Sequence, residues 1–365
     1  MPESFWLPLI TTRKIFETCA DKSLFFFANK TSLIAQNKYK NHERILNMVN
    51  IQKCAIIGCG FVGATTAYTL MNSEMFSEIV LIDIDKKKAE GEAADMNHGL
   101  PFISPMEIYA GDYSDLSDAA IIIITAGANQ KNGETRLDLL NQNAKIFRSI
   151  VSNVCAYNNE GIILVVTNPV DILTYVTLIA SGFPKNRVIG SGTVLDTARL
   201  KYLVGRHLEV DPRNVHTFII GEHGDSELPV WSSANISGVD LDRYCLSCHK
   251  KCSLEKLDSL AVDVKKSAYK IIDAKGATYY AIAESVKKIV SSIVKDENTV
   301  LPVSSFVEGH YGLENICLGL PSIVGRNGVK EILEIPLNDT ELDMLKNSAR
   351  KIKTIVDSLD FSHIT

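Results

Sequence analysis

The chain contains 365 residues, of which 46% are hydrophobic, and its formal net charge is −5. A chain of this length buries a large core and is expected to form about two domains. The acidic balance argues against a nucleic-acid-binding surface, and no apolar run approaches the ~20 residues of a membrane-spanning helix. These properties are typical of an ordinary soluble globular protein.

Residues 1–47 differ in composition from the rest of the chain. They hold seven Lys or Arg and four Asp or Glu, so residues 48–365 carry a net charge of −8. They contain the short apolar cluster 24–27 but no signal-peptide pattern, and their acids and lysines fit a transit peptide poorly. We predict a disordered extension or a mis-assigned start, because termini without packing partners are commonly disordered. A targeting or partner-binding arm is the alternative.

A glycine-rich segment, GCGFVG, follows the first strong apolar run and leads into a helix-like segment. Its three glycines permit, in order, a tight turn, the approach of a pyrophosphate to the backbone, and close packing of helix on strand. The phosphates would lie at the positive N-terminus of the helix. The residues expected to contact a dinucleotide here are Gly58, Gly60, Phe61, Val62 and Gly63.

A second apolar run ends in Asp83, twenty residues after Gly63. A carboxylate at this place accepts hydrogen bonds from both ribose hydroxyls and repels a 2′-phosphate. The cofactor is therefore predicted to be NAD rather than NADP.

From residue 51 onward, strand-like runs alternate with helix-like segments. This rhythm predicts a Rossmann-type, doubly wound parallel sheet with helices on both faces, in an NAD-binding domain at 48–190. The strands are expected at 53–58, 78–83, 106–110, 120–125, 161–166 and 187–190, and the helices at 62–73, 86–99, 135–157 and 170–182.

Beyond residue 190 the pattern becomes mixed and predicts an α+β substrate domain at 191–365. Strands are expected near 213–220, 298–308 and 315–325, and long amphipathic helices at 193–208, 254–294 and 338–359. Since no linker separates the two halves, we expect a substantial interface with the active site between them.

The strand at 120–125 ends in small residues and is followed by a polar segment. Small residues let the backbone lie against a cofactor, and a Gly-flanked loop that carries Arg136 is suited to close as a lid. A solvated surface loop is the alternative. The residues assigned to the cofactor here are Thr125, Ala126 and Gly127.

Polar residues stand at three further places along the chain. Asn168 follows a strand at the sheet edge where doubly wound folds bind ligands, although it is equally suited to cap the next helix. Asp196 and Arg199 lie three residues apart on one helix face, where an intrahelical salt bridge is the plainer interpretation. His223 stands between two glycines and two acids, and a histidine titrates near neutrality, so it is a candidate proton donor and acceptor.

The cysteines do not indicate a disulfide scaffold, because eight are spread over a long chain and several fall in predicted core strands. Cys245, Cys248, His249 and Cys252 contain the Cys-x-x-Cys-His pattern of haem attachment and are also candidate zinc ligands. Haem attachment needs export, and four zinc ligands within eight residues are cramped. We therefore expect reduced thiols in a cytoplasmic protein, and a surface turn without metal at this segment.

Six motifs in this order resemble the bacterial L-lactate dehydrogenases of the lactate/malate dehydrogenase family, from about residue 51 to residue 359. They are GCGFVG, TAGANQKNGETR, VVTNPVD, GTVLDTAR, IGEHGDSELPVW and KGATYYAIA. The resemblance implies NAD-dependent interconversion of pyruvate and L-lactate by a homotetramer.

The resemblance also implies residue roles. His223 would exchange a proton with the substrate oxygen, and Asp196 would hold the other ring nitrogen, pairing with His223 rather than with Arg199. Arg199 would bind the substrate carboxylate through two parallel hydrogen bonds. Arg136 would enter with the lid to polarise the carbonyl group. Asn168 would orient the substrate, and Thr278 would line the pocket.

Gln130 bears on the choice of substrate, because malate dehydrogenases of the family have arginine at the matching position. A neutral glutamine leaves the second carboxylate of oxaloacetate unpaired in a closed site, which is costly. The resemblance therefore favours lactate over malate, and a bulkier 2-hydroxy acid is the remaining alternative.

Lys201 and His216 match the positions that bind fructose 1,6-bisphosphate between subunits in bacterial relatives. The family commonly has arginine where this chain has Lys201, and a lysine attracts phosphate without the two-pronged geometry. Two facing copies would repel each other until a bisphosphate neutralises them. Allosteric activation is thus expected, with ordinary surface residues as the alternative.

Overall fold

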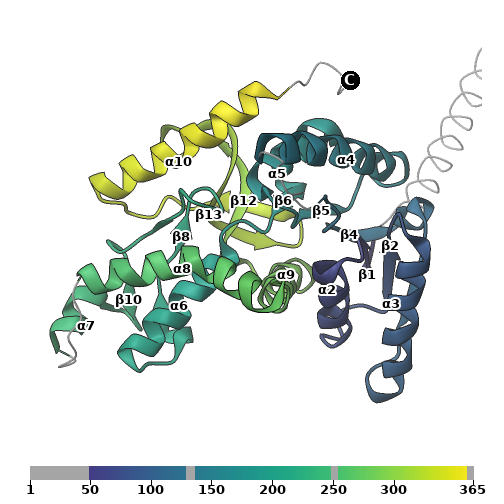
Figure 1. Cartoon of the computed structure of the whole chain (residues 1–365), viewed down its shortest axis with the longest axis horizontal. Helices are drawn as coiled ribbons and strands as arrows, with labels where there is room; N and C mark the ends of the chain where they lie inside the picture. Colours follow the sequence, from purple (N-terminus) through teal and green to yellow (C-terminus); the bar gives the residue numbers. More distant parts are fainter. Residues whose placement is uncertain (1–48, 129–135, 248–253, 360–365) are drawn as a thin grey trace, which may run out of the picture. The chain divides into compact units, whose positions relative to one another are not determined.

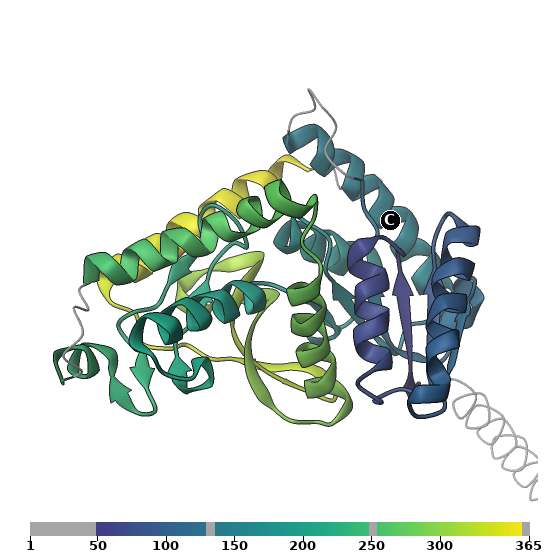
Figure 2. The ribbon, with the colours of Figure 1, turned by 60° about the horizontal axis from the view of Figure 1, so that its bottom comes forward.

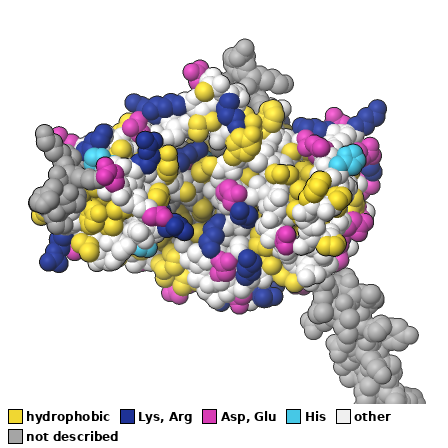
Figure 3. All heavy atoms as spheres, turned by 90° about the horizontal axis from the view of Figure 1, so that it is seen from below, with side chains coloured by type: hydrophobic (Ala, Val, Ile, Leu, Met, Phe, Trp, Pro, Cys, Tyr) yellow, Lys and Arg dark blue, Asp and Glu magenta, His cyan; other side chains and the backbone are white. Residues whose placement is uncertain are grey.

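The computed structural model describes residues 49–128, 136–247 and 254–359, which lie within one compact unit, Val49–Thr365 (Figure 1). The extension at 1–47 and Gln130 lie outside the described residues, as do Cys248, His249 and Cys252. No described helix is long and apolar enough to cross a membrane. On the face seen in Figure 3, acidic and basic side chains are interspersed among apolar ones.

A nine-stranded sheet forms the centre of the described chain, in the order β14-β13-β12-β6-β5-β4-β1-β2-β3. The strands are β1 (Asn50–Ile57), β2 (Glu78–Ile82), β3 (Glu107–Ala110), β4 (Ala119–Ile124), β5 (Ile162–Val165), β6 (Val188–Gly190), β12 (Thr299–Glu308), β13 (Glu314–Gly325) and β14 (Gly328–Ile332). Strands β1 to β6 pair in parallel in the order 3-2-1-4-5-6, that of dinucleotide-binding folds. The predicted Rossmann-type sheet is confirmed.

Helices cover both faces of this sheet: α4 and α5 lie on one face, and α2, α3 and α9 lie on the other (Figures 1 and 2). The helices are α2 (Phe61–Met71), α3 (Lys86–Gly99), α4 (Arg136–Tyr157), α5 (Val170–Ser181), α6 (Val194–Leu208), α7 (Leu241–Ser247), α8 (Leu254–Lys275), α9 (Tyr280–Val294) and α10 (Asp339–Ser358). In β4, Ile122 packs in the cluster that holds Phe147 of α4, and Ile123 packs in the cluster that holds Leu70 of α2. A strand buried on both faces needs such an unbroken apolar run.

The second half of the chain continues the same sheet, because Ser304 of β12 pairs antiparallel with Gly190 of β6. Small strands complete it: β7 (Val215–His216), β10 (Asn235–Ile236) and β11 (Val239–Asp240) form one sheet, and β8 (Ile219–Ile220) pairs with β9 (Leu228–Pro229). A third apolar cluster lies among α6, α7, α8, β7 and β10. The division into domains at residue 190 stays a prediction.

Two predicted elements were wrong. The helix expected at 254–294 is two helices, because α8 ends before Gly276, whose φ is +84°, and a glycine in this region commonly ends a helix. The strand expected at 213–220 is two short strands, β7 and β8, which belong to different sheets. Neither β14 nor α7 was predicted.

The cysteines follow the sequence-based expectation only in part. Cys54, Cys59 and Cys317 are buried and free, and Cys155 is also free. Cys245 is disulfide-bonded. The expectation of reduced thiols was therefore wrong at Cys245.

Candidate active site

The glycine turn after β1 brings the predicted cofactor residues of two strands together. A Cβ on Gly58 would lie 2.5 Å from the backbone nitrogen of Ala126, and a Cβ on Gly63 would lie 1.8 Å from the carbonyl oxygen of Gly58. The hydroxyl of Thr125 donates a hydrogen bond to that same oxygen at 2.7 Å. Both glycines are thus required by the packing of the protein itself.

Gly60 is in a different position, since nothing lies within 4 Å of a Cβ built on it. It starts α2 with no side-chain cap, and the next residue, Phe61, is 70% exposed. An uncapped helix N-terminus with open space before it suits a phosphate group. Asp83 accepts a hydrogen bond from the backbone N–H of Cys59 at 2.6 Å, so its carboxylate lies beside the turn. These residues fit a dinucleotide.

Val62 and Gly127 are two further residues near the turn that are predicted to contact the cofactor. Val62 is half-buried. A Cβ on Gly127 would lie 2.5 Å from Cγ2 of Thr167, so a larger residue there would displace the loop that follows β5.

A pocket of about 600 Å³ lies among α4, α5, α6, α8, α10 and the loop between β8 and β9. Four of the predicted site residues line it: Asn168, Asp196, Arg199 and His223. The helices α4, α5, α8 and α10 contribute its apolar wall. The volume is within the ordinary range of small-ligand sites.

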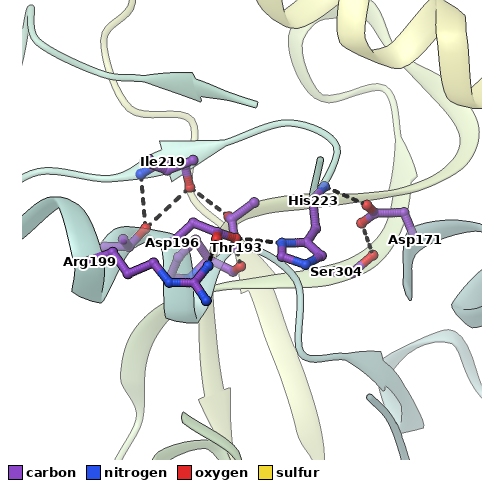
Figure 4. A network of polar contacts seen from close by, with 9 residues as sticks. Asp171, Thr193, Asp196, Arg199, Ile219, His223 and Ser304 are labelled. Atoms are coloured by element: carbon purple, nitrogen blue, oxygen red, sulfur yellow. Dashed lines mark hydrogen bonds and ion pairs between the residues drawn. The ribbon is translucent and has the colours of Figure 1, made fainter. Parts of the chain in front are cut away.

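Asp196 is the centre of the polar network in this pocket (Figure 4). Its Oδ2 lies 2.5 Å from Nδ1 of His223, and its Oδ1 accepts a hydrogen bond from a guanidinium nitrogen of Arg199 at 2.8 Å. Asp196 therefore pairs with His223, as expected, but it also pairs with Arg199, so the expectation that it would not was wrong. A carboxylate has two oxygens, and each holds one cation.

The pair of Asp196 and His223 is ionised at neutral pH. Burial lowers the pKa of His223, but the charge of Asp196 and the hydrogen bond to it outweigh burial and raise that pKa to about 9. Burial raises the pKa of Asp196, but His223 and Arg199 together hold it below its ordinary value. The imidazole side chain is 24% exposed, so the protonated ring faces a pocket open to substrate.

Asp171 on α5 fixes the backbone that carries His223, a role that no pattern in the sequence indicated. It is 1% exposed, and its two oxygens accept hydrogen bonds from the backbone N–H of His223 at 2.8 Å and from the hydroxyl of Ser304 at 2.6 Å (Figure 4). On the other side, the hydroxyl of Thr193 donates to the carbonyl of Ile219 at 2.6 Å. The loop after β8 is thus held by Asp171 of α5, which Ser304 of β12 supports, and β8 itself is held by Thr193 at the N-terminus of α6.

The other predicted site residues either do not line the pocket or have side chains that the structure does not describe. Thr278 is half-buried in the turn between α8 and α9 and does not line the pocket. Arg136 is the first residue of α4, but its side chain is not among those described. Lys201 is half-buried on α6, where burial lowers its pKa, and His216 is exposed on β7.

Comparisons with known proteins cover nearly all of the described chain. Two family models match: "lactate/malate dehydrogenase, NAD binding domain" over residues 52–190, and "lactate/malate dehydrogenase, alpha/beta C-terminal domain" over residues 193–360. The L-lactate dehydrogenase of Acetivibrio thermocellus is 57% identical over 310 residues, which are 85% of this chain and 98% of the relative. That of a Thermoanaerobacter species is 56% identical over 310 residues, which are 85% of this chain and 100% of the relative.

Solved structures give the same result. A lactate dehydrogenase from a Medee basin deep-sea metagenome library superposes with a TM-score of 0.83 at 45% identity, covering 85% of this chain and 99% of the other. The minor L-lactate dehydrogenase of Enterococcus mundtii gives a TM-score of 0.83 at 44% identity, with the same coverage of both chains.

Proposed function

The chain belongs to the lactate/malate dehydrogenase family and is an NAD-dependent oxidoreductase, and we propose that it interconverts pyruvate and L-lactate. The observation that carries this proposal is the ionised pair of Asp196 and His223 in a pocket that also contains Arg199. A 2-oxo acid presents a carboxylate and a ketone, and the pocket offers one cation to each.

His223 is proposed as the proton donor and acceptor. Because Asp196 contacts Nδ1, Nε2 is the ring nitrogen that serves the substrate oxygen. A pKa of about 9 keeps the ring protonated at neutral pH, as the reduction of a ketone requires. Oxidation of the alcohol requires the neutral ring, so that direction is favoured at higher pH.

Arg199 is proposed to bind the substrate carboxylate. A guanidinium group has five N–H donors in a fixed plane, and the bond to Asp196 occupies one nitrogen. The contact with Asp196 also fixes the orientation of the group. Its planar geometry permits two parallel hydrogen bonds to a carboxylate, which a lysine does not provide.

When bound, NADH supplies the hydride that reduces the ketone carbon. The turn at Gly60 would hold the pyrophosphate, and Asp83 would bind the ribose hydroxyls and disfavour a 2′-phosphate. The neighbouring residues Thr125, Ala126 and Gly127 would line the cofactor groove.

The remaining site residues complete the proposal. Arg136 and Gln130 would act from the lid, the first on the carbonyl group and the second in rejecting oxaloacetate. Asn168, which lines the pocket, would orient the substrate. Thr278 would reach the pocket only if the turn between α8 and α9 moved inward.

Assembly and regulation belong to the same proposal. We infer a homotetramer, in which Lys201 and His216 would bind fructose 1,6-bisphosphate as an activator between subunits. Pyruvate saturation curves with and without millimolar bisphosphate, recorded over a range of protein concentrations, test this, because identical curves throughout would reject the effector site.

A cytoplasmic location and a domain boundary at residue 190 complete the proposal. The free thiols of Cys54, Cys59, Cys155 and Cys317 support the cytoplasm, whereas the disulfide at Cys245 counts against it. Thiol labelling of the protein isolated from its native cells would show whether Cys245 is reduced or oxidised there.

Steady-state kinetics test the activity. We expect pyruvate to be preferred over oxaloacetate and over branched 2-oxo acids, and NADH over NADPH. A preference for oxaloacetate would indicate a malate dehydrogenase, and a preference for a branched acid would indicate a wider specificity.

A further inference from the structure

Glu227 is a buried acid in the active-site pocket. It belongs neither to the cofactor turn nor to the groups proposed to transfer the proton. It lies in the loop between β8 and β9, lines the pocket, and is 2% exposed. Its Oε1 is buried without a hydrogen-bond partner among the described residues. A carboxylate oxygen of Glu227, one of Asp196 and a ring nitrogen of His223 lie within 4.8 Å of one another.

An ionised Glu227 is costly in this position. A buried carboxylate needs a partner for each oxygen, and Oε1 of Glu227 has none among the described residues, because the neighbouring cations contact other groups. Asp196 holds both His223 and Arg199, and the ammonium of Lys265 on α8 donates to the backbone oxygen of Asp225 at 3.1 Å.

The protonation state follows from these surroundings. Burial raises the pKa of Glu227 to about 8, and the charge of Asp196 adds to this effect, while His223, Lys265 and Arg199 oppose it. At neutral pH the side chain is therefore a neutral carboxylic acid, and it ionises on mild alkalinisation.

We propose that Glu227 is a specificity-determining residue for the anionic substrate: the pocket binds the 2-oxo acid while Glu227 is neutral and loses it when Glu227 ionises. This inference rests on the proposed function. With Glu227 neutral, the contacting triad of Arg199, His223 and Asp196 carries one positive charge in excess, which suits the single negative charge of pyruvate. Glu222, Asp225 and Lys265 also line the pocket. Ionisation of Glu227 cancels that excess and places a second carboxylate against the substrate.

The slope of the alkaline limb in the pH profile of kcat/KM for pyruvate reports how many groups must stay protonated. For the wild type we expect a limb that falls about a hundredfold per pH unit once both His223 and Glu227 have ionised. In Glu227→Gln the limb should fall only about tenfold per unit, because His223 alone remains. This difference in slope does not depend on the exact pKa of His223, which removal of a neighbouring charge also changes.

Two further measurements complete the test. Asp225→Asn removes an acid from the same loop and pocket wall, but at an exposed position, and should keep the steep wild-type limb. The infrared spectrum of the wild type at neutral pH should contain the carbonyl stretch of a protonated carboxylic acid, absent from Glu227→Gln and lost from the wild type on titration through about pH 8.

The possible failures are distinguishable. A wild-type limb that falls only tenfold per unit, or an infrared band that Glu227→Gln retains, would overturn the role of Glu227 and leave the proposed function intact. A wild type that does not reduce pyruvate at any pH would overturn the proposed function and this inference with it. If Glu227→Gln does not fold, a wild-type limb that falls only tenfold per unit would still overturn the role of Glu227.

Discussion

The cofactor turn and the substrate pocket are built from different kinds of contact. At the turn, backbone atoms approach so closely that a Cβ on Gly63 would lie 1.8 Å from the oxygen of Gly58. In the pocket, the decisive contacts join ionised side chains, with Asp196 between His223 and Arg199. Steric overlap is indifferent to pH, whereas charge pairs depend on it. Changes of volume should therefore damage the turn, and changes of charge should damage the pocket.

The largest effect is expected for His223→Gln, which removes the proton donor while leaving the turn intact. Turnover of pyruvate should fall by roughly 100- to 10,000-fold, the usual value of general acid catalysis. Binding of NADH, followed by its fluorescence, should be retained. A variant with more than about a tenth of the wild-type rate would show that another group supplies the proton.

Gln130→Arg extends the charge argument to the lid. The added guanidinium offers a charge-assisted pair to the second carboxylate of oxaloacetate and faces the methyl group of pyruvate without a partner. A hydrogen bond to a charged group contributes about 1.5–3 kcal/mol, so the ratio of kcat/KM values should move toward oxaloacetate by roughly 10- to 100-fold. An unchanged ratio would place Gln130 away from the substrate.

Gly63→Ala and Gly60→Ala form a matched pair at the turn. The methyl group at 63 meets a backbone oxygen, so thermal and urea unfolding should show a loss of about 1–3 kcal/mol or more. The methyl group at 60 meets no protein atom, so stability should be kept and only the affinity for NADH should fall. Equal stability of the two variants would contradict the packing described for Gly63.

The pH dependence of stability tests the ion pair of His223 and Asp196 in the folded protein. The pKa of His223 is about 9 in the folded protein against an ordinary 6.5, so the folded state binds the proton more tightly. The stabilisation is complete below about pH 6.5, and it is lost as the pH rises through about 9. It amounts to at most about 3 kcal/mol. Urea unfolding of the wild type and His223→Gln should therefore give free energies whose difference declines between neutral pH and pH 9. A constant difference would mean that the ion pair with Asp196 does not stabilise the fold.

The parallel half of the fold and the cofactor turn could be predicted from the amino-acid sequence. Each strand there is a short apolar run, and each functional glycine stands at a fixed distance from its neighbours, so the information is local. The glycine spacing and the acid at Asp83 predicted a turn that the structure contains, and the six predicted strands lie within a few residues of their observed bounds.

The contacts that hold the pocket together could not be predicted in the same way, because they join distant parts of the chain. Asp171 meets His223 across 52 residues and Ser304 across 133, and no periodicity in a chain relates positions so far apart. The same holds for Glu227. The sequence shows only an acid four residues after His223, whereas the burial of Oε1 without a hydrogen-bond partner is visible only in the folded protein. Spacing records the geometry of a single helix or turn, whereas the pKa of a side chain depends on which distant elements exclude water from it.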